Sequence, residues 1–203
     1  NSIKLSVITT LLTLLISSMA AYAFAKLRFP FRGAMFAMLI SFMIIPEQAT
    51  LVPRYILIKW FGLYNTHEAL ILMGMFSIYF TFLLRQFMLG VSSDFLEAAK
   101  MDGAGYMRMY WQIMLPLCKP ILATVAIIKF IWSWNDYQNP LIFLYEDRLY
   151  TIPLGIQKFQ EEFVSNYSVT MMASVSAIIP LIVLFLVLQK QVIAGISLGG
   201  IKG

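Results

Sequence analysis

The sequence has 203 residues, of which 60% are hydrophobic and only 12% are charged, and its mean hydropathy is +0.79. Soluble domains carry roughly twice this share of charged residues, so the composition excludes an ordinary soluble globular domain. It predicts an all-α integral membrane protein, because a helix satisfies its own backbone hydrogen bonds in lipid. The formal net charge is +5, but the basic residues lie at the ends of apolar runs and do not form a patch for nucleic acid.

Five apolar segments follow one another along the chain and predict a bundle of five membrane-spanning helices. The second segment is interrupted by Pro46 and Pro53, and we expect it to continue through 55–58 as a kinked or re-entrant piece, because proline removes a backbone donor. Pro180 predicts a kink in the fifth. The five segments cover 3–25, 34–45, 69–89, 120–140 and 171–189.

Lysine and arginine residues divide unequally between the two sides that five spans create, with nine on one side and five on the other. The richer side is predicted to be cytoplasmic. It holds the longest link, from Arg85 to Lys119, and the end of the chain. Five spans then place Asn1 outside the cell, so we expect a sixth span on the N-terminal side of this sequence.

The cytoplasmic link 92–116 has the pattern of ordered helix rather than of a flexible loop. Residues 92–94 (Ser-Ser-Asp) have N-cap chemistry, and Glu97, three residues after Asp94, predicts an arrangement close to a capping box. Gly103 and Gly105 are expected to end this helix.

A second short helix, 106–115, is expected to stop at Pro116. Isolated helices of fewer than roughly 12 residues are marginal in water, so other contacts must hold both pieces. The residues leave two possibilities open, which are packing against the spans of this chain and docking to a cytoplasmic partner.

The spacing of residues in this link resembles a known motif. The sequence Glu97-Ala98-Ala99, three residues, Gly103, nine residues, then Ile113-Met114-Leu115-Pro116 is similar to the EAA loop of binding-protein-dependent ABC importers, and every specified position matches. The resemblance implies a permease subunit whose loop, about 92–116, forms coupling helices that seat in a cleft of an ATPase subunit. Nucleotide-driven closure of the ATPase pair would then move the spans.

Roles for single residues follow from the same resemblance. Glu97 would meet a basic group of the ATPase, Ala98 and Ala99 would fit the cleft, and Gly103 would form the turn. Glu97 also has the capping role named above, and both roles can hold. Ile113, Leu115 and Pro116 complete the motif.

Five further stretches resemble the maltose-type carbohydrate permeases, and with them the resemblance covers essentially the whole chain as a single transmembrane permease domain, 1–203. It implies ATP-driven movement of a di- or oligosaccharide, or a related solute, by alternating access across the plasma membrane of a bacterium or archaeon. The Gly-rich tail, 195–203, would extend to the ATPase dimer, although chain ends are commonly disordered. The five stretches are 1–2, 20–29, 84–87, 134–137 and 199–203.

The implied partners are a second, homologous permease subunit, a pair of cytoplasmic ATPase subunits, an extracytoplasmic sugar-binding protein and the lipid bilayer. This chain has no phosphate-binding loop motif, so ATP and Mg would be bound by the ATPase subunits and no cofactor is expected here. Cys118 and His67 each lack neighbours at metal-ligand spacing, so no metal site is expected either, and His67 is predicted to lie at the surface.

Residues of the fourth segment are candidates for a solute path. Lys129 lies near its middle, where an ionisable side chain faces protein or water, and it could pair helices, snorkel to an interface or line the path. Trp134 could belong to an interfacial aromatic belt or stack on a sugar. Asn135 and Asp136 could hydrogen-bond to a sugar.

Two other classes of function would each require residues that the sequence lacks. A secondary transporter or channel working without an ATPase would need ion-relay carboxylates within the spans, and none of the five segments has a central Asp or Glu. A membrane enzyme would need a nucleophile and base, a His cluster or a phosphate loop, and the sequence has no such pattern.

Overall fold

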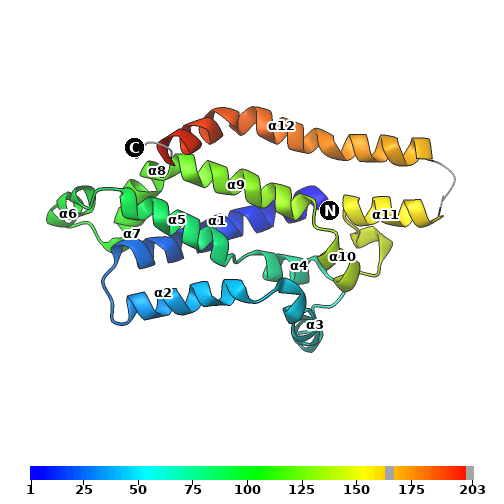
Figure 1. Ribbon diagram of the computed structural model, residues 1–203, viewed down its shortest axis with the longest axis horizontal. Helices are drawn as coiled ribbons and strands as arrows, with labels where there is room; N and C mark the ends of the chain where they lie inside the picture. The colour runs from blue at the N-terminus through cyan, green and yellow to red at the C-terminus, as the bar shows by residue number, and fades with distance from the viewer. Residues whose placement is uncertain (163–166, 200–203) are drawn as a thin grey trace. The chain divides into compact units, whose positions relative to one another are not determined.

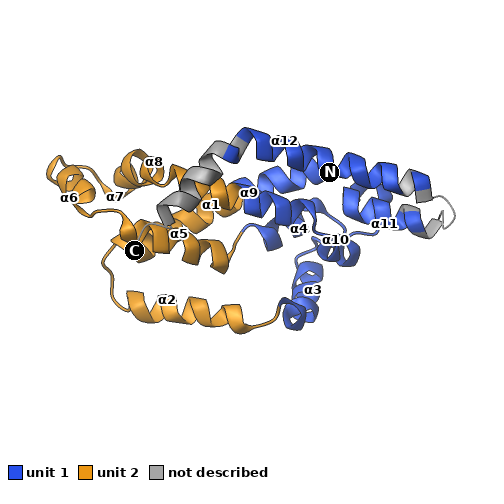
Figure 2. Cartoon of the chain, turned by 45° about the horizontal axis from the view of Figure 1, so that its top comes forward, with its two compact units in different colours: residues 1–11, 47–75, 127–189 blue, residues 12–46, 76–126, 190–203 orange. Residues whose placement is uncertain are grey.

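The computed structural model describes residues 1–162 and 167–199, which form helices joined by turns and short links, with no strand in either range. Two units can be distinguished, each built from three stretches of the chain (Figure 2). Unit 1 comprises 1–11, 47–75 and 127–189, and unit 2 comprises 12–46, 76–126 and 190–203. That the whole chain is a single permease domain stays a prediction.

The helices follow one another in chain order as labelled in Figure 1. Short 3-10 turns occur at Phe42–Ile44, Glu47–Thr50 and Asp147–Leu149, and a π-helical turn occurs at Tyr110–Met114. The α-helices are α1 (Ser2–Lys26), α2 (Arg32–Ser41), α3 (Leu51–Trp60), α4 (His67–Gly74), α5 (Ile78–Gly90), α6 (Asp94–Met101), α7 (Tyr106–Met109), α8 (Leu115–Leu117), α9 (Lys119–Trp134), α10 (Gln138–Phe143), α11 (Ile152–Glu162) and α12 (Tyr167–Gly199).

All five predicted segments contain helix, but they differ in whether they could cross a membrane. Ser2–Lys26 and His67–Gly90 are each long and apolar enough to do so alone. Among the described residues the number rises to four if each of two broken helix pairs counts as one span. The apolar helix Met171–Val187, in the fifth segment, is shorter. The break in the first pair falls between Ile44 and Glu47, as the kinked continuation past Pro46 predicted.

The fourth segment ends earlier than predicted. Helix α9 stops at Trp134, and Pro140 lies in the separate helix α10. The carboxylate of Asp136 accepts hydrogen bonds from the backbone N (3.1 Å) and side-chain Nδ2 (2.9 Å) of Asn139. Side chains of this kind compete with helix continuation by bonding to the local backbone, so the chain turns here and α10 begins.

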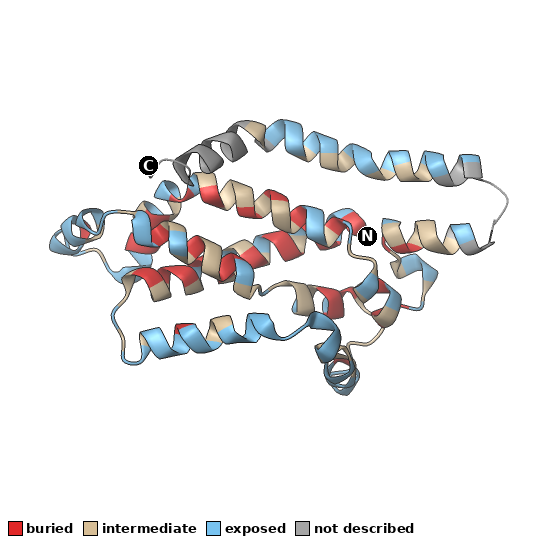
Figure 3. Cartoon of the chain, viewed as in Figure 1, coloured by how far each residue is buried: buried red, intermediate tan, exposed pale blue. Residues whose placement is uncertain are grey.

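Exposed apolar side chains mark the helices suited to lipid or to a partner subunit. In α2 only Phe36 is buried, and the described side chains of α12 are largely exposed, as the pale blue of Figure 3 shows. In the predicted tail, 195–203, residues 195–199 belong to α12, and 200–203 lie outside the described residues.

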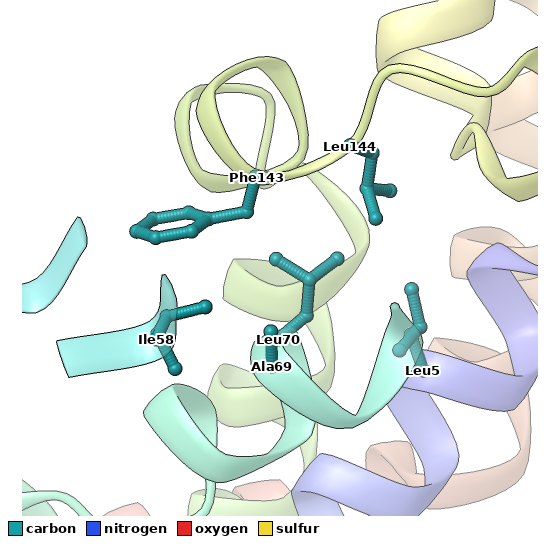
Figure 4. Packing of buried hydrophobic residues seen from close by; sticks show 6 residues of the cluster. All are labelled: Leu5, Ile58, Ala69, Leu70, Phe143 and Leu144. Atoms are coloured by element: carbon teal, nitrogen blue, oxygen red, sulfur yellow. The ribbon is translucent and has the colours of Figure 1, made fainter. Parts of the chain in front are cut away.

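The core of unit 1 joins residues that are far apart in the sequence. Figure 4 shows Ile58 of α3, Ala69 and Leu70 of α4, and Phe143 at the end of α10 gathered together with Leu5 of α1 and Leu144. All six are buried. Removal of this apolar surface from water or from headgroups stabilises unit 1.

Asn65 ties two links of unit 1 together. Its Oδ1 accepts hydrogen bonds from the backbone N of Tyr145 (3.0 Å) and of Glu146 (3.2 Å), and its Nδ2 donates to Oε1 of Glu146 (2.7 Å). Its own backbone N donates to the carbonyl of Phe143 (3.0 Å). Its φ of 61° is left-handed, a conformation that asparagine tolerates better than most residues.

The prediction that His67 lies at the surface is wrong. The side chain is buried, and its Nε2 lies 2.9 Å from the carbonyl oxygen of Leu149 in the same unit. A histidine at the first residue of a helix fits the interior when a backbone group satisfies its ring nitrogen.

We expect Asn65→Ala to lower the free energy of unfolding by about 2–3 kcal/mol, because it removes three hydrogen bonds that do not form elsewhere. Asn65→Gly keeps the left-handed backbone and should be milder. Thermal unfolding in detergent measures both. Asn135→Ala is the control, since that exposed side chain bonds only to Ile131 of its own helix. Equal stability of the Asn65→Ala and Asn135→Ala variants would refute the role of Asn65.

Candidate functional site

Helix α6, the first helix of the 92–116 loop, begins without the predicted capping box. Its N-cap residue, Ser93, makes no side-chain cap hydrogen bond. The only local side-chain bond at this end is from the backbone N of Asp94 to Oγ of Ser92 (3.2 Å). Glu97 therefore does not cap the helix, and its side chain is exposed.

The end of α6 explains the glycine of the motif. Gly103 has φ 78°, in the left-handed region. Its backbone N donates to the carbonyl of Lys100 (3.0 Å), and the N of Ala104 donates to that of Ala99 (2.9 Å). These two bonds form a Schellman motif, in which the residue after the C-cap must be left-handed and is usually glycine. Gly105, by contrast, has φ −73° and begins α7.

The outer surface of α6 and α7 carries large apolar side chains and the motif carboxylate. Met101 is 88% exposed and Phe95 54% exposed, and Tyr106, Met107 and Trp111 are also exposed. Ala98 is exposed beside Glu97, whereas Ala99 is buried. Because α6 also carries Asp94 and Lys100, it is not a helix for the lipid core.

The second helical part of the loop ends one residue beyond Pro116. The chain continues from α7 through the π-helical turn Tyr110–Met114 into α8, which contains Pro116 and ends at Leu117. The helix that follows, α9, is turned by 80° from it. A proline ring clashes with the carbonyl four residues earlier in an α-helix, and the wider π turn just before it relieves that clash. Ile113 and Leu115 are half-buried and Pro116 is exposed.

Three contacts fasten the loop to α1. Oγ of Ser18 and the phenol oxygen of Tyr110 lie 2.7 Å apart in a buried hydrogen bond. The phenol of Tyr22 donates to the carbonyl of Tyr106 (3.3 Å), and its ring lies 5.5 Å from that of Tyr110. Nζ of Lys26 donates to the carbonyl of Val91 (2.6 Å), just before the loop.

Sequence reasoning missed these contacts, although α1 carries a signal for them. Ser18, Tyr22 and Lys26 are spaced by four residues and so lie on one face of the helix. Three polar or amphipathic residues on one face of an apolar helix indicate a surface that meets polar groups of the same protein.

The end of α1 is also held against α2 and α5. Nε of Arg85 donates to the carbonyl of Phe24 (3.2 Å), and its guanidinium carbon lies 3.9 Å from the ring centre of Phe36. The rings of Phe24 and Phe36 are 5.4 Å apart. A cation over an aromatic face is attracted by the ring quadrupole, so this cluster stabilises the junction of three helices in unit 2.

The four candidates for a solute path do not form a site together. No hydrogen bond or ion pair among the described residues joins any two of them. Trp134 is only 2% exposed, and its Nε1 donates to the carbonyl of Ala177 (3.1 Å), so the prediction of an interfacial belt residue is wrong for this side chain. Asn135 is exposed and its side chain donates to the carbonyl of Ile131 in α9, and Asp136 bonds to Asn139 in the first turn of α10.

Lys129 lies where three helices of unit 1, α1, α4 and α9, pass closely. A Cβ atom added at Gly74 would lie 3.7 Å from Nζ of Lys129 and 3.2 Å from Cγ2 of Thr9. Thr9 in turn lies 2.9 Å from Oγ of Ser133, oxygen to oxygen. The amine therefore faces protein and not lipid, as an ionisable group in a span should.

Comparison with known proteins identifies the chain. Residues 7–197 match the family of inner membrane components of binding-protein-dependent transport systems. The chain belongs to this family. It is thus a permease subunit of an ABC importer and not an enzyme.

Individual relatives cover the whole of this chain. It is 34% identical over 203 residues to the arabinooligosaccharides transport permease AraQ of Bacillus subtilis, spanning 100% of this chain and 72% of the relative. It is 36% identical over 206 residues to the melibiose/raffinose/stachyose import permease MelC of the same species, spanning 100% of this chain and 75% of the relative.

A solved structure supports the same assignment of fold. It is the crystal structure of a bacterial ABC transporter involved in the import of the acidic polysaccharide alginate. One of its chains is 26% identical to this chain, with a TM-score of 0.81, and the match covers 94% of this chain and 72% of that one.

We expect Gly103→Ser to destabilise α6, because a side chain at a left-handed residue costs about 1–2 kcal/mol. Hydrogen exchange of the α6 amides measures the effect as faster exchange. The matched control is Gly105→Ser, since an added Cβ meets nothing within 4 Å at either glycine and only Gly103 has positive φ. Similar exchange rates in the two variants would show that the turn does not depend on Gly103.

Proposed function

We propose that this permease subunit carries a di- or oligosaccharide, or a related solute, across the plasma membrane of a bacterium or archaeon. The names of the relatives support this proposal, since they import arabino-oligosaccharides and melibiose, raffinose and stachyose, and the solved transporter imports alginate. The apolar helices support a multi-pass arrangement. The observation that most supports an ATP-driven mechanism is the exposed surface of α6 and α7, which suits docking on an ATPase subunit.

The proposed assembly contains a second, homologous permease subunit, a pair of cytoplasmic ATPase subunits and an extracytoplasmic sugar-binding protein. ATP and Mg bind to the ATPase subunits. The family description supports a separate binding protein. The C-terminal tail, 195–203, extends toward the ATPase pair.

In this proposal the 92–116 loop docks on the ATPase. The exposed side chains of Phe95 and Met101 fill an apolar cleft, the small side chain of Ala98 permits close approach, and Glu97 pairs with a basic group. Because the carboxylate of Glu97 does not cap its own helix, it is available to pair with a basic group.

Movement of the docked loop reaches the membrane through α1. The bonds from Ser18 to Tyr110 and from Tyr22 to Tyr106 make α7 and this end of α1 parts of one packed unit. Closure and opening of the ATPase pair would therefore displace α1 and favour different packings of the bundle, which is alternating access.

Within the membrane, Lys129 and Asn135 remain the candidates for contact with solute. Lys129 is partly buried among helices of unit 1, and the side chain of Asn135 is exposed. Trp134 and Asp136 would act by positioning this region, because their polar atoms already bond within unit 1.

Orientation can be tested with a single cysteine. We expect Met101→Cys, in membranes that lack the ATPase subunits, to react with a membrane-impermeant maleimide only from the cytoplasmic side, because this position is 88% exposed on α6. The wild-type protein should not react with the maleimide, because Cys118, its single cysteine, is buried. Tyr145→Cys, on an exposed link of unit 1, should react only from outside. Labelling of Met101→Cys from outside would overturn the proposed mechanism.

The docking role predicts that Glu97→Gln reduces ATP-dependent oligosaccharide uptake into proteoliposomes by about tenfold, since a charge-assisted hydrogen bond contributes about 1.5–3 kcal/mol. Copurification with the ATPase measures the loss of docking directly. Asp94→Asn is the control, because it removes the same charge one turn earlier on the same exposed helix. Unchanged uptake by Glu97→Gln, or an equal loss in Asp94→Asn, would count against the assigned contact.

A further inference from the structure

A pocket of about 560 Å³ lies in unit 2, behind the docking surface of α6. Its wall comes from the end of α1, the 27–32 link, α6 and the start of α7. Four cations and one carboxylate line it, so the formal charge of the wall is four minus one, or +3. They are Lys26, Arg28, Arg32, Lys100 and Glu97.

The cations of this pocket are not neutralised within the described residues. The ion pairs found there join Arg54 to Glu47, Arg148 to Glu146 and Lys158 to Asp147, and none involves the pocket. Lys26 and Arg32 each donate to one backbone carbonyl, of Val91 and of Leu27 (2.9 Å), and keep further N–H groups. Arg28 and Lys100 are exposed. Several donors with a net positive charge around one cavity favour an oxygen-rich anion such as a phosphate.

Apolar surface adjoins the cations. Leu27, Leu96 and Met109 also line the pocket. On the neighbouring α2 and its N-cap, Phe31, Met35 and Met38 are exposed. The pocket lies where α1 ends, at Lys26, and this is where an apolar helix leaves the hydrocarbon core and meets the headgroups.

We propose that this pocket binds the phosphate headgroup of an anionic phospholipid from the cytoplasmic leaflet, with its acyl chains along α2. Basic pockets at the cytoplasmic ends of membrane helices suit such headgroups. The proposal rests on the orientation given under the proposed function. The lipid phosphate binds the 27–32 link and α6 together, and it neutralises the cations of the pocket.

The test measures lipid binding to the whole transporter, purified in detergent, by native mass spectrometry with added phosphatidylglycerol or phosphatidylcholine. We expect wild type to retain phosphatidylglycerol in preference. Each basic residue near an anionic lipid contributes about fivefold in affinity, so Arg28→Gln with Lys100→Gln should weaken retention by about thirtyfold. The matched control is Arg108→Gln with Lys119→Gln, which removes the same charge outside the pocket and should leave retention unchanged.

Four outcomes would overturn the proposal. The first is equal retention of the two lipids, and the second is an equal loss in the pocket and control pairs. The third is displacement of the lipid by millimolar inorganic phosphate at constant ionic strength, which would assign the pocket to a soluble phosphate. The fourth is loss of ATPase copurification in the pocket pair with lipid retention intact, which would assign the cations to the ATPase. Because the readout is lipid binding, a failure of sugar uptake would not affect it.

Discussion

The attachment of the 92–116 loop to α1 is the constraint on which the proposed mechanism depends. An eight-residue helix such as α6 does not hold its own shape in water, so its stability must come from packing and from its ends. Gly103 closes one end through the Schellman turn, and Lys26 binds the backbone just before the other. Ser18 and Tyr22 then fasten the following α7 segment. With these contacts in place the loop has one position relative to α1, and a displacement of one displaces the other.

Exposed apolar surface has two meanings in this chain, and the surrounding residues distinguish them. On α2 after Arg32 and on α12 between Met171 and Val187 the helix carries no charged residue, and this surface is suited to lipid or to a partner subunit. On α6 and α7 it occurs beside Asp94, Glu97 and Lys100, which cannot enter the hydrocarbon core. Because lipid cannot cover a surface with these charges, only another protein can remove Met101 and Phe95 from water. The pocket behind α6 adds a third kind of surface, in which cations and apolar side chains meet at the level of the headgroups.

Polar residues of unit 1 are used mainly to fix the fold. Asn65, His67, Trp134 and Asp136 each direct their polar atoms to backbone groups brought near by folding. Such bonds shape the links and short helices between the longer ones. Residue type alone suggested a sugar contact for Trp134 and Asp136, because it does not reveal whether a polar atom already has a partner.

The sequence by itself determined what depends on local pattern. Apolar runs located the helices, the break at Pro46 followed from a missing backbone donor, and the spacing from Glu97 to Pro116 indicated the family. It also indicated the turn at Gly103, since a left-handed residue after a helix is a local requirement. The tertiary structure decided what depends on contacts between distant residues. The burial of His67, the bond between Ser18 and Tyr110, and the gathering of four cations around one cavity required segments far apart in the chain to meet. Even the passage of the helix through Pro116 depended on a π turn, a local feature that the residue types do not specify.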